Sequence, residues 1–217
     1  MVLSVRHQLK AARGWVAAFY LPAFVLLGAG VFFSHRSGVN FGNLTRDPTY
    51  LMRMSPFVGV YSNLGVLMWA ATAAVCFYTA AIVKRFGKRN NHAGFFLASG
   101  FITLILLVDD LFLVHETIAP YLFNITEIIT FGVYGLVFAA YAYWFRSVLQ
   151  ATDYVILLAA ILLFGGSLVF DQIYNAVSTW QYLYEDGLKW FAIVSWMTYY
   201  CKTSYDEVKR TLHKGNR

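Results

Sequence analysis

The chain of 217 residues is 59% hydrophobic and 13% charged, with a mean hydropathy of +0.56. Soluble domains carry about 25% charged residues, so this composition excludes a soluble globular domain and predicts an all-α integral membrane protein. The net charge of +6 does not indicate nucleic-acid binding, because Lys and Arg stand in short blocks between apolar runs, as in membrane proteins. We expect the lipid bilayer, and no nucleic acid, as a partner.

The first apolar run follows a basic segment at the start of the chain. Residues 1–14 mix apolar side chains with Lys, Arg and His, which predicts a short amphipathic helix at the cytoplasmic membrane surface. Residues 15–33 are apolar over a longer stretch than the core of a signal peptide, and no clear small-residue cleavage site is present. We therefore predict a first membrane-spanning helix that is retained, followed by the longest loop, 34–55.

Five further apolar runs come close to the roughly 20 residues that a membrane-spanning helix needs. A compact basic block, 84–89, follows the first of them, and Asn124 stands three residues before Glu127, the spacing of a helix capping box. The predicted spans lie at 56–83, 93–116, 127–145, 154–174 and 185–200, and a basic tail occupies 201–217. The sequence thus predicts one transmembrane domain, residues 15–200, folded as a six-transmembrane-helix bundle.

The distribution of Lys and Arg predicts the orientation of this bundle. With six spans both termini share one side, where thirteen Lys and Arg residues fall, against three in the 34–55 loop. Cytoplasmic loops carry an excess of basic residues, so we expect both termini in the cytoplasm. Lys189, within the sixth span, is the remaining cation.

Asp109 and Asp110 are the least expected residues of the sequence. They end an apolar run, and a carboxylate at the centre of a bilayer costs about 2.5–3.5 kcal/mol. The helix dipole favours acids at a helix N-terminus, such as Glu127, Glu185 and Asp186, and opposes acids near a C-terminus. The acids near predicted C-terminal ends are Asp109, Asp110, Glu116 and Asp171. These four need a proton, a cation or several hydrogen-bond donors.

The predicted topology brings these groups together at the outer membrane face. Asp109 and Glu116 are seven residues apart and share one helix face, while Asp110 and His115 point to either side of it. One helix cannot direct all four at a single point unless it unwinds near its end. The predicted site consists of Asp109 or Asp110 with His115 or Glu116, completed by Asp171 and by Glu185 or Asp186. We expect Lys189 to pair with one of these acids, and a purely structural pair within its own helix is the alternative.

Carboxylates with one imidazole suit a hard or borderline divalent metal ion, such as Mg²⁺, Mn²⁺, Ca²⁺, Fe²⁺ or Zn²⁺. The predicted metal ligands are Asp109, Asp110, Asp171, Glu185 and Asp186. The sequence contains no HExxH or Cys-pair motif, so it does not identify the metal. The other histidines fall in predicted terminal or loop segments, which excludes paired axial ligands for a membrane haem.

Three functions are compatible with such a site. The first is a metal-dependent hydrolase of a lipid or lipid-linked substrate at the outer leaflet, with His115 or Glu116 as general base and Lys189 stabilising an oxyanion. The second is a cation- or proton-coupled transporter, although a transport pathway needs polar groups through the full membrane thickness and these acids lie at one face. The third is an accessory or assembly subunit of a larger membrane complex, in which the acids pair internally or bind other subunits.

Overall fold

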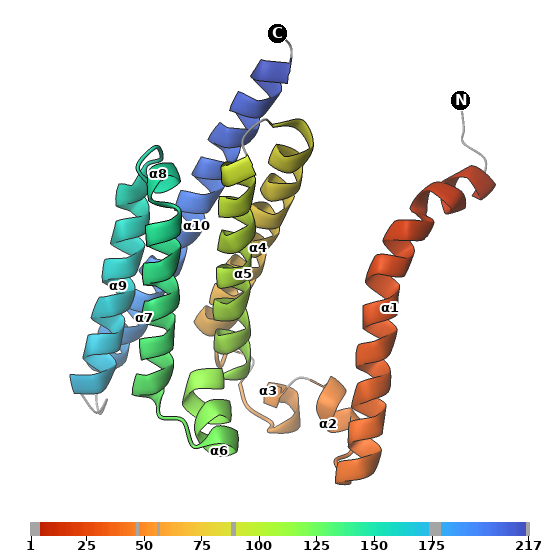
Figure 1. Cartoon of the computed structure of the whole chain (residues 1–217). Helices are drawn as coiled ribbons and strands as arrows, with labels where there is room; N and C mark the ends of the chain where they lie inside the picture. Colours follow the sequence, from red (N-terminus) through yellow and green to blue (C-terminus); the bar gives the residue numbers. More distant parts are fainter. Residues whose placement is uncertain (1–4, 47, 56, 88–89, 174–178, 216–217) are drawn as a thin grey trace. The chain divides into compact units, whose positions relative to one another are not determined.

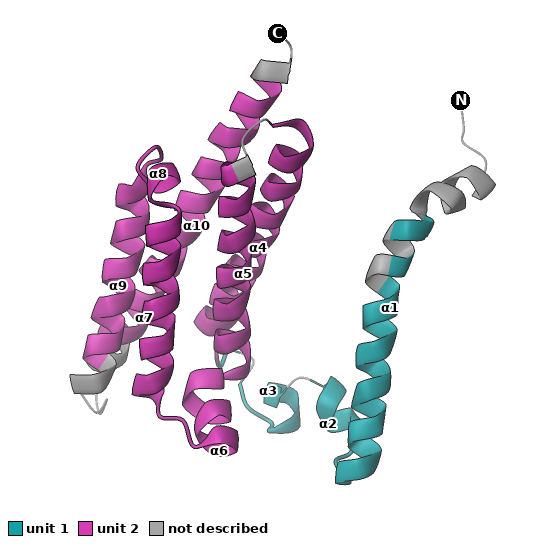
Figure 2. Ribbon diagram, in the orientation of Figure 1, with its two compact units in different colours: residues 1–58 teal, residues 59–217 magenta. Residues whose placement is uncertain are grey.

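The computed structural model of the protein describes residues 5–46, 48–55, 57–87, 90–173 and 179–215 (Figure 1). The regular structure in this part of the chain is helical and contains no strand, which confirms the all-α prediction. The helices form two compact units, residues 1–58 and residues 59–217 (Figure 2).

Unit 1 consists of one long helix and two short ones. These are α1 (Val5–Ser37), α2 (Phe41–Thr45) and α3 (Pro48–Leu51). The sequence predicted an interfacial helix over 1–14 and a span over 15–33, and α1 continues from Val5 across the junction between them, since helix-favouring residues surround Gly14 there. Gly38, with a φ of +71°, follows α1 in the left-handed conformation that glycine adopts without strain. Asn40 begins α2 by accepting a hydrogen bond from the backbone N–H of Gly42 at 2.8 Å.

Unit 2 contains the helices that carry the predicted site. These are α4 (Val60–Phe86), α5 (Asn90–Phe112), the π-helix η1 (Val114–Ile118), α6 (Ala119–Phe123), α7 (Glu127–Trp144), α8 (Arg146–Leu149), α9 (Tyr154–Ile173) and α10 (Thr179–Gly215). α4 packs along both α5 and α10, and α9 packs along α10, while α7 makes its backbone contacts near its ends, with η1, α6 and α8. α8 lies at one end of unit 2, and η1 and α6 lie at the other (Figure 1). We call these the α8 end and the η1 end.

Three helices of unit 2 are long and apolar enough to cross a membrane. They are Val60–Phe86, Asn91–Phe112 and Glu127–Trp144, and a shorter apolar helix covers Tyr154–Phe170. The third predicted span, 93–116, therefore ends at Phe112, because the helix breaks there. Within the described residues these helices agree with a membrane protein, and the count of six spans stays a prediction.

α10 is longer than a helix needs to be to span a membrane. It has 37 residues, whereas about 20 cross the hydrocarbon. It therefore continues the predicted sixth span, 185–200, into the predicted tail, 201–217, as one helix. Its C-terminal turns project past the α8 end (Figure 1).

Large aromatic side chains fill the core of unit 2 between α4, α5 and α10. Trp69 of α4 and Trp196 of α10 are each 2% exposed, and their ring centroids lie 5.8 Å apart. Phe95 of α5 and Tyr200 of α10 are both buried, with ring centroids 6.3 Å apart. These contacts hold α10 against α4 and α5, and so position the polar side chains that the same helices carry.

Gly100 offers a direct test of the packing between α4 and α5. A Cβ atom there would lie 2.7 Å from Cε1 of Phe77 on α4, whereas a Cβ atom at Gly135 on α7 would meet nothing within 4 Å. We expect Gly100→Ala to lower the free energy of unfolding by about 1–3 kcal/mol, the usual range for overpacking. Gly135→Ala should leave stability unchanged or raise it, since alanine favours helix. Thermal unfolding in detergent measures both variants, and equal shifts would contradict the close contact.

Candidate functional site

α5 breaks directly after the two acids that the sequence singled out. Leu113 has a φ of +51°, a left-handed conformation that is rare for leucine, and the next residues form η1. The backbone N–H groups of Thr117 and Ile118 both donate to the carbonyl oxygen of Leu113, which holds the break in place. Strained backbone and π-helical turns are both frequent at functional sites. The side chains around this break are therefore the first candidates for function.

The break turns His115 back onto Asp109. Nδ1 of His115 lies 2.7 Å from Oδ2 of Asp109, and the backbone N–H of His115 donates to Oδ1 at 3.0 Å. Tyr134 of α7 lies close enough to the same carboxylate to interact with it electrostatically. Phe131 packs beside the imidazole, with ring centroids 5.1 Å apart. The buried carboxylate thus accepts two hydrogen bonds from His115, which explains in physical terms how an acid is tolerated near the end of a membrane helix.

A second carboxylate faces the other side of the imidazole. Nε2 of His115 lies 3.4 Å from Oε1 of Glu116, so both ring nitrogens face an acid. Burial lowers the pKa of His115, but the hydrogen bonds and negative charges of Asp109 and Glu116 outweigh burial and raise this pKa to about 9. The hydrogen bond from His115 in turn lowers the pKa of Glu116. At neutral pH His115 is therefore an imidazolium between two carboxylates.

Asp110 forms an ion pair with Lys189 of α10, whereas Asp109 contacts His115 of η1. Nζ of Lys189 lies 2.6 Å from Oδ1 of Asp110, whose side chain is only 9% exposed. Gly65 of α4 lies beside this pair and packs closely against α10, because a Cβ atom there would lie 3.2 Å from Cδ1 of Ile193 and 3.8 Å from Oδ2 of Asp110. The prediction that Lys189 has a carboxylate partner is confirmed, with the partner on a different helix.

The other predicted residues lie near this pair or beyond the described side chains. Asp186 of α10 is exposed and shares the η1 end with Lys189 and Glu116, whose charges act on it. Glu185 is half-buried, and its backbone carbonyl accepts a hydrogen bond from Oγ of Ser167 at 3.0 Å. Asp171 belongs to the last turn of α9, but its side chain lies outside the described part of the chain.

Two of the five carboxylates predicted to bind a metal have other partners in the structure. Asp109 contacts His115 and Asp110 contacts Lys189. Among the residues that the structure describes, no group of three His, Cys, Asp or Glu side chains is arranged to hold a metal ion. The counter-charge nearest to Asp109 is the imidazolium of His115. A metal held with the help of Asp171 stays a prediction.

Polar contacts also join α5 to α10 along their shared length. Nearest the η1 end is the Asp110–Lys189 ion pair. Further along, Nε1 of Trp196 donates a hydrogen bond to Oγ1 of Thr103 at 3.1 Å, and Oγ1 of Thr103 donates to the backbone carbonyl of Ser99. Trp196 and Thr103 are both buried, so this contact lies in the interior of unit 2.

Two further contacts continue toward the α8 end. The hydroxyl of Tyr141 on α7 lies 2.7 Å from Oγ of Ser99 and 3.2 Å from the hydroxyl of Tyr200, and so bridges α5 to α10. Beyond them, Nδ1 of His92 lies 3.2 Å from Oε2 of Glu207. We call four contacts the polar ladder: Asp110–Lys189, Thr103–Trp196, Ser99–Tyr141–Tyr200 and His92–Glu207.

The ladder follows from spacing in the sequence. Its α5 members are His92, Ser99, Thr103 and Asp110, and its α10 members are Lys189, Trp196, Tyr200 and Glu207. In both sets the second, third and fourth members lie seven, eleven and eighteen residues after the first. These offsets complete whole helical turns to within about 20°, so the four residues of each set lie in a straight stripe along one face of their helix. Because the two helices run antiparallel and the offsets are equal, each residue of one stripe faces a residue of the other. Eighteen residues of helix measure about 27 Å, close to the roughly 30 Å of hydrocarbon in a bilayer.

Neither Tyr134 nor the inner members of the ladder were among the predicted site residues. His92 was expected in a loop, but it lies in the first turn of α5. Ser99 and Thr103 are isolated polar residues within an apolar run, and only the offsets shared with a second span mark them. The left-handed conformation of Leu113 has no signal in the sequence, since glycine or asparagine is the usual residue there.

The raised pKa of His115 predicts how stability depends on pH. An ordinary imidazole has a pKa of 6.5, so the charged form contributes fully to stability below that value and the contribution is lost as the pH rises toward about 9. We expect the Tm of the wild type to fall over this window, and the Tm of His115→Gln to be lower at pH 6 and flatter above it. Thermal unfolding at several pH values measures this, with His213→Gln, at an exposed position of α10, as the control. A wild-type profile in His115→Gln would rule out a charge on this imidazole.

The Asp110–Lys189 pair predicts non-additive effects of mutation. Lys189→Met leaves the nearly buried Asp110 charge without its partner, whereas Asp110→Asn leaves a Lys189 side chain that is 37% exposed and can reach solvent. Breaking a fully buried ion pair costs about 3–5 kcal/mol. We expect at most this loss for Lys189→Met, a smaller loss for Asp110→Asn and partial recovery in the double variant. A double-mutant cycle of unfolding free energies measures the coupling, and additive losses would contradict a direct interaction.

Comparison with known proteins gives the family of the chain. Residues 9–203 match the family model described as a domain of unknown function, DUF8692. No curated protein and no solved structure matches the chain. The matched range includes the break in α5 and every ladder residue except Glu207. The chain therefore belongs to the DUF8692 family.

Proposed function

We propose that the protein translocates protons across its membrane along the polar ladder. The observation that carries this proposal is that the ladder extends over about 27 Å of helix, close to the thickness of the hydrocarbon. Acids at one membrane face do not make a transport pathway. The ladder supplies polar groups through the remaining thickness, from Asp110 to His92.

The side chains of the ladder have the chemistry that proton transfer needs. Hydroxyl groups both donate and accept hydrogen bonds, and three of them meet at Ser99, Tyr141 and Tyr200 in the interior of unit 2. A carboxylate stands at each of its two ends, and at one end an imidazole, whose two ring nitrogens can donate and accept a proton, stands beside it. Adjacent contacts are roughly 6–10 Å apart along the helix axis, so water molecules complete the path in this proposal.

His115 is the proton-exchange group of the η1 end in this proposal. Its imidazolium lies between the nearly buried Asp109 and Glu116, whose side chain is 47% exposed. Transfer of the Nε2 proton to Glu116 gives a carboxylic acid that can release the proton to solvent. Asp109 holds the imidazole in position and is followed directly by Asp110, so this exchange site adjoins the first contact of the ladder.

The membrane arrangement that we propose has six spans and cytoplasmic termini. α1 supplies the first span, α4, α5 and α7 the next three, α9 the fifth and α10 the sixth. The distribution of thirteen Lys and Arg residues on one side against three in the 34–55 loop supports this orientation. The η1 end then faces the outside, and the α8 end faces the cytoplasm.

A second candidate function is a hydrolase of a lipid or lipid-linked substrate at the η1 end. The pairing of His115 with Asp109 favours it, because a carboxylate on Nδ1 orients the imidazole, and once the Nε2 proton has passed to Glu116 that nitrogen can act as a general base. Lys189 would then stabilise an oxyanion, and Asp186 would help to bind a divalent metal ion. This function requires the groups at the η1 end but not the ladder, so ladder variants separate the two candidates. Assembly with other membrane subunits is a third role, in which the same acids serve as internal ion pairs.

Proton flux into vesicles tests the proposed function. The purified protein is reconstituted into phosphatidylcholine vesicles with an entrapped pH-sensitive dye, and a potassium diffusion potential set by valinomycin drives proton entry. We expect wild-type vesicles to acidify faster than protein-free vesicles, and Thr103→Val to slow the flux about tenfold or more, which corresponds to a barrier higher by about 1.4 kcal/mol. Thr72→Val is the matched control, since Thr72 of α4 is also buried but bonds to the Met68 carbonyl of its own helix at 2.7 Å.

Two results would contradict this proposal. Wild-type vesicles that acidify no faster than protein-free vesicles would overturn proton translocation. Thr103→Val vesicles that conduct as fast as the wild type would remove the ladder from the path.

A further inference from the structure

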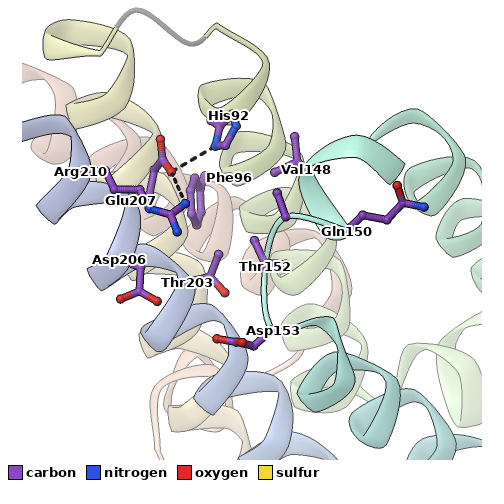
Figure 3. Close-up of a pocket in the computed structure, with 11 residues that line it drawn as sticks. His92, Phe96, Val148, Gln150, Thr152, Asp153, Thr203, Asp206, Glu207 and Arg210 are labelled. Carbon is purple, nitrogen blue, oxygen red and sulfur yellow. Dashed lines mark ion pairs between the residues drawn. The ribbon is translucent and has the colours of Figure 1, made fainter. Parts of the chain in front are cut away.

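A polar cavity lies at the α8 end of unit 2 (Figure 3). Its volume of about 210 Å³ far exceeds the roughly 30 Å³ that one water molecule occupies in the liquid. The first turns of α5, the segment after α8 and the C-terminal part of α10 form its walls. Its polar lining includes His92, Thr152, Asp153, Thr203, Asp206 and Glu207. The cavity is therefore large and polar enough to hold several water molecules.

Glu207 is the most buried of the three acids that line this cavity. Its side chain is 7% exposed, against 60% for Asp153 and 41% for Asp206. Nδ1 of His92 approaches Oε2 of Glu207 from α5 at 3.2 Å, and Nη1 of Arg210 approaches the same oxygen from α10 at 3.9 Å (Figure 3). A carboxylate and an imidazole, both able to exchange protons, thus meet in the wall of a cavity that accommodates water.

The His92–Glu207 pair and the side chains around it, taken with a neutral imidazole, have a net negative charge that one bound proton would neutralise. Lys202 of α10 forms ion pairs with both Asp153 and Asp206, the second at 3.0 Å. With Arg210 and the carboxylate of the pair, these side chains carry two positive and three negative charges. A protonated imidazole at His92 brings the cluster to neutrality. The cluster therefore changes between neutral and singly negative when the pair binds or releases one proton.

Hydroxyl groups lead inward from the cavity to the third contact of the ladder. Oγ1 of Thr152, in the cavity wall, lies 2.8 Å from the hydroxyl of Tyr199. The rings of Tyr199 and Tyr200 are neighbours, with centroids 4.9 Å apart. The hydroxyl of Tyr200 lies 3.2 Å from that of Tyr141. Polar groups thus extend from the cavity toward the middle of unit 2.

We propose that the His92–Glu207 pair is the proton-exchange site of the α8 end, the counterpart of His115 at the η1 end. This inference rests on the proposed proton translocation and names the groups through which protons meet solvent at the second membrane face. A hydronium ion in the cavity gives its proton to the Glu207 carboxylate, so that an O–H bond forms and water remains. This O–H bond breaks when the proton passes to a water molecule on the inner side, or to a hydroxyl that in the same step gives its own proton to the next acceptor, and either transfer restores the carboxylate. His92 holds the carboxylate and shares its proton.

The vesicle assay tests this site through Glu207→Gln, which keeps the shape of the side chain but cannot take up a proton. We expect the proton flux to fall about tenfold or more. The matched control is Glu127→Gln, in the first turn of α7 at the η1 end, which should keep the wild-type flux. His92→Gln should lower the flux and shift the pH at which the flux is half-maximal. A purely structural role would not shift this pH.

The outcomes separate this inference from the function on which it rests. Wild-type vesicles without flux would overturn the proposed function itself. If the wild type conducts, Thr103→Val does not, and Glu207→Gln keeps the wild-type rate and pH profile, only the exchange site at the α8 end is overturned. If Glu207→Gln does not give a folded protein by size-exclusion chromatography, the rate and pH profile of His92→Gln decide between the same two results.

Discussion

Hydrocarbon offers no hydrogen-bond partner, so polar side chains within a membrane helix must find partners on neighbouring helices. α5 and α10 meet this requirement together. Ion pairs occupy the two ends of the ladder, where solvent is near, and neutral hydroxyl and indole groups occupy its interior. A hydrogen bond between membrane helices contributes only about 0.6 kcal/mol on average. The ladder therefore stabilises the unit modestly, and its larger effect is to select one antiparallel register.

The break in α5 assigns separate roles to two adjacent acids. Residues 109 and 110 of an uninterrupted helix point about 100° apart, so one site cannot use both. Asp110 stays on the ladder stripe and contacts Lys189, while η1 brings His115 to Asp109. Two cations on different elements thus neutralise two neighbouring carboxylates. This arrangement requires a strained, left-handed backbone at Leu113. The two hydrogen bonds to the carbonyl oxygen of Leu113 stabilise that conformation.

How much could be predicted from the sequence depended on whether a feature is periodic. Long apolar runs predicted the helices α4, α5 and α7, and the unusual position of Asp109 and Asp110 predicted where polar contacts gather. A partner for Lys189 followed from the cost of an unpaired charge. The sequence left open which of Asp109 and Asp110 meets His115 or Glu116, because an intact helix points Asp109 and His115 apart and no turn residue marks the break at Leu113. The end of α5 and the continuity of α1 and α10 were missed as well, since composition alone does not locate helix ends.

The equal spacing in α5 and α10 restricts where the chain can change in length. One residue inserted between Ser99 and Thr103 would rotate everything on one side of it by about 100°, and Asp110 and His92 could no longer both face α10. An insertion in the 34–55 segment rotates no part of either stripe. Relatives that keep the ladder can therefore gain or lose residues in their loops, whereas a one-residue deletion within α5 or α10 turns part of its stripe away from the other helix, and a matching deletion in the partner would restore only the spacing along the axis.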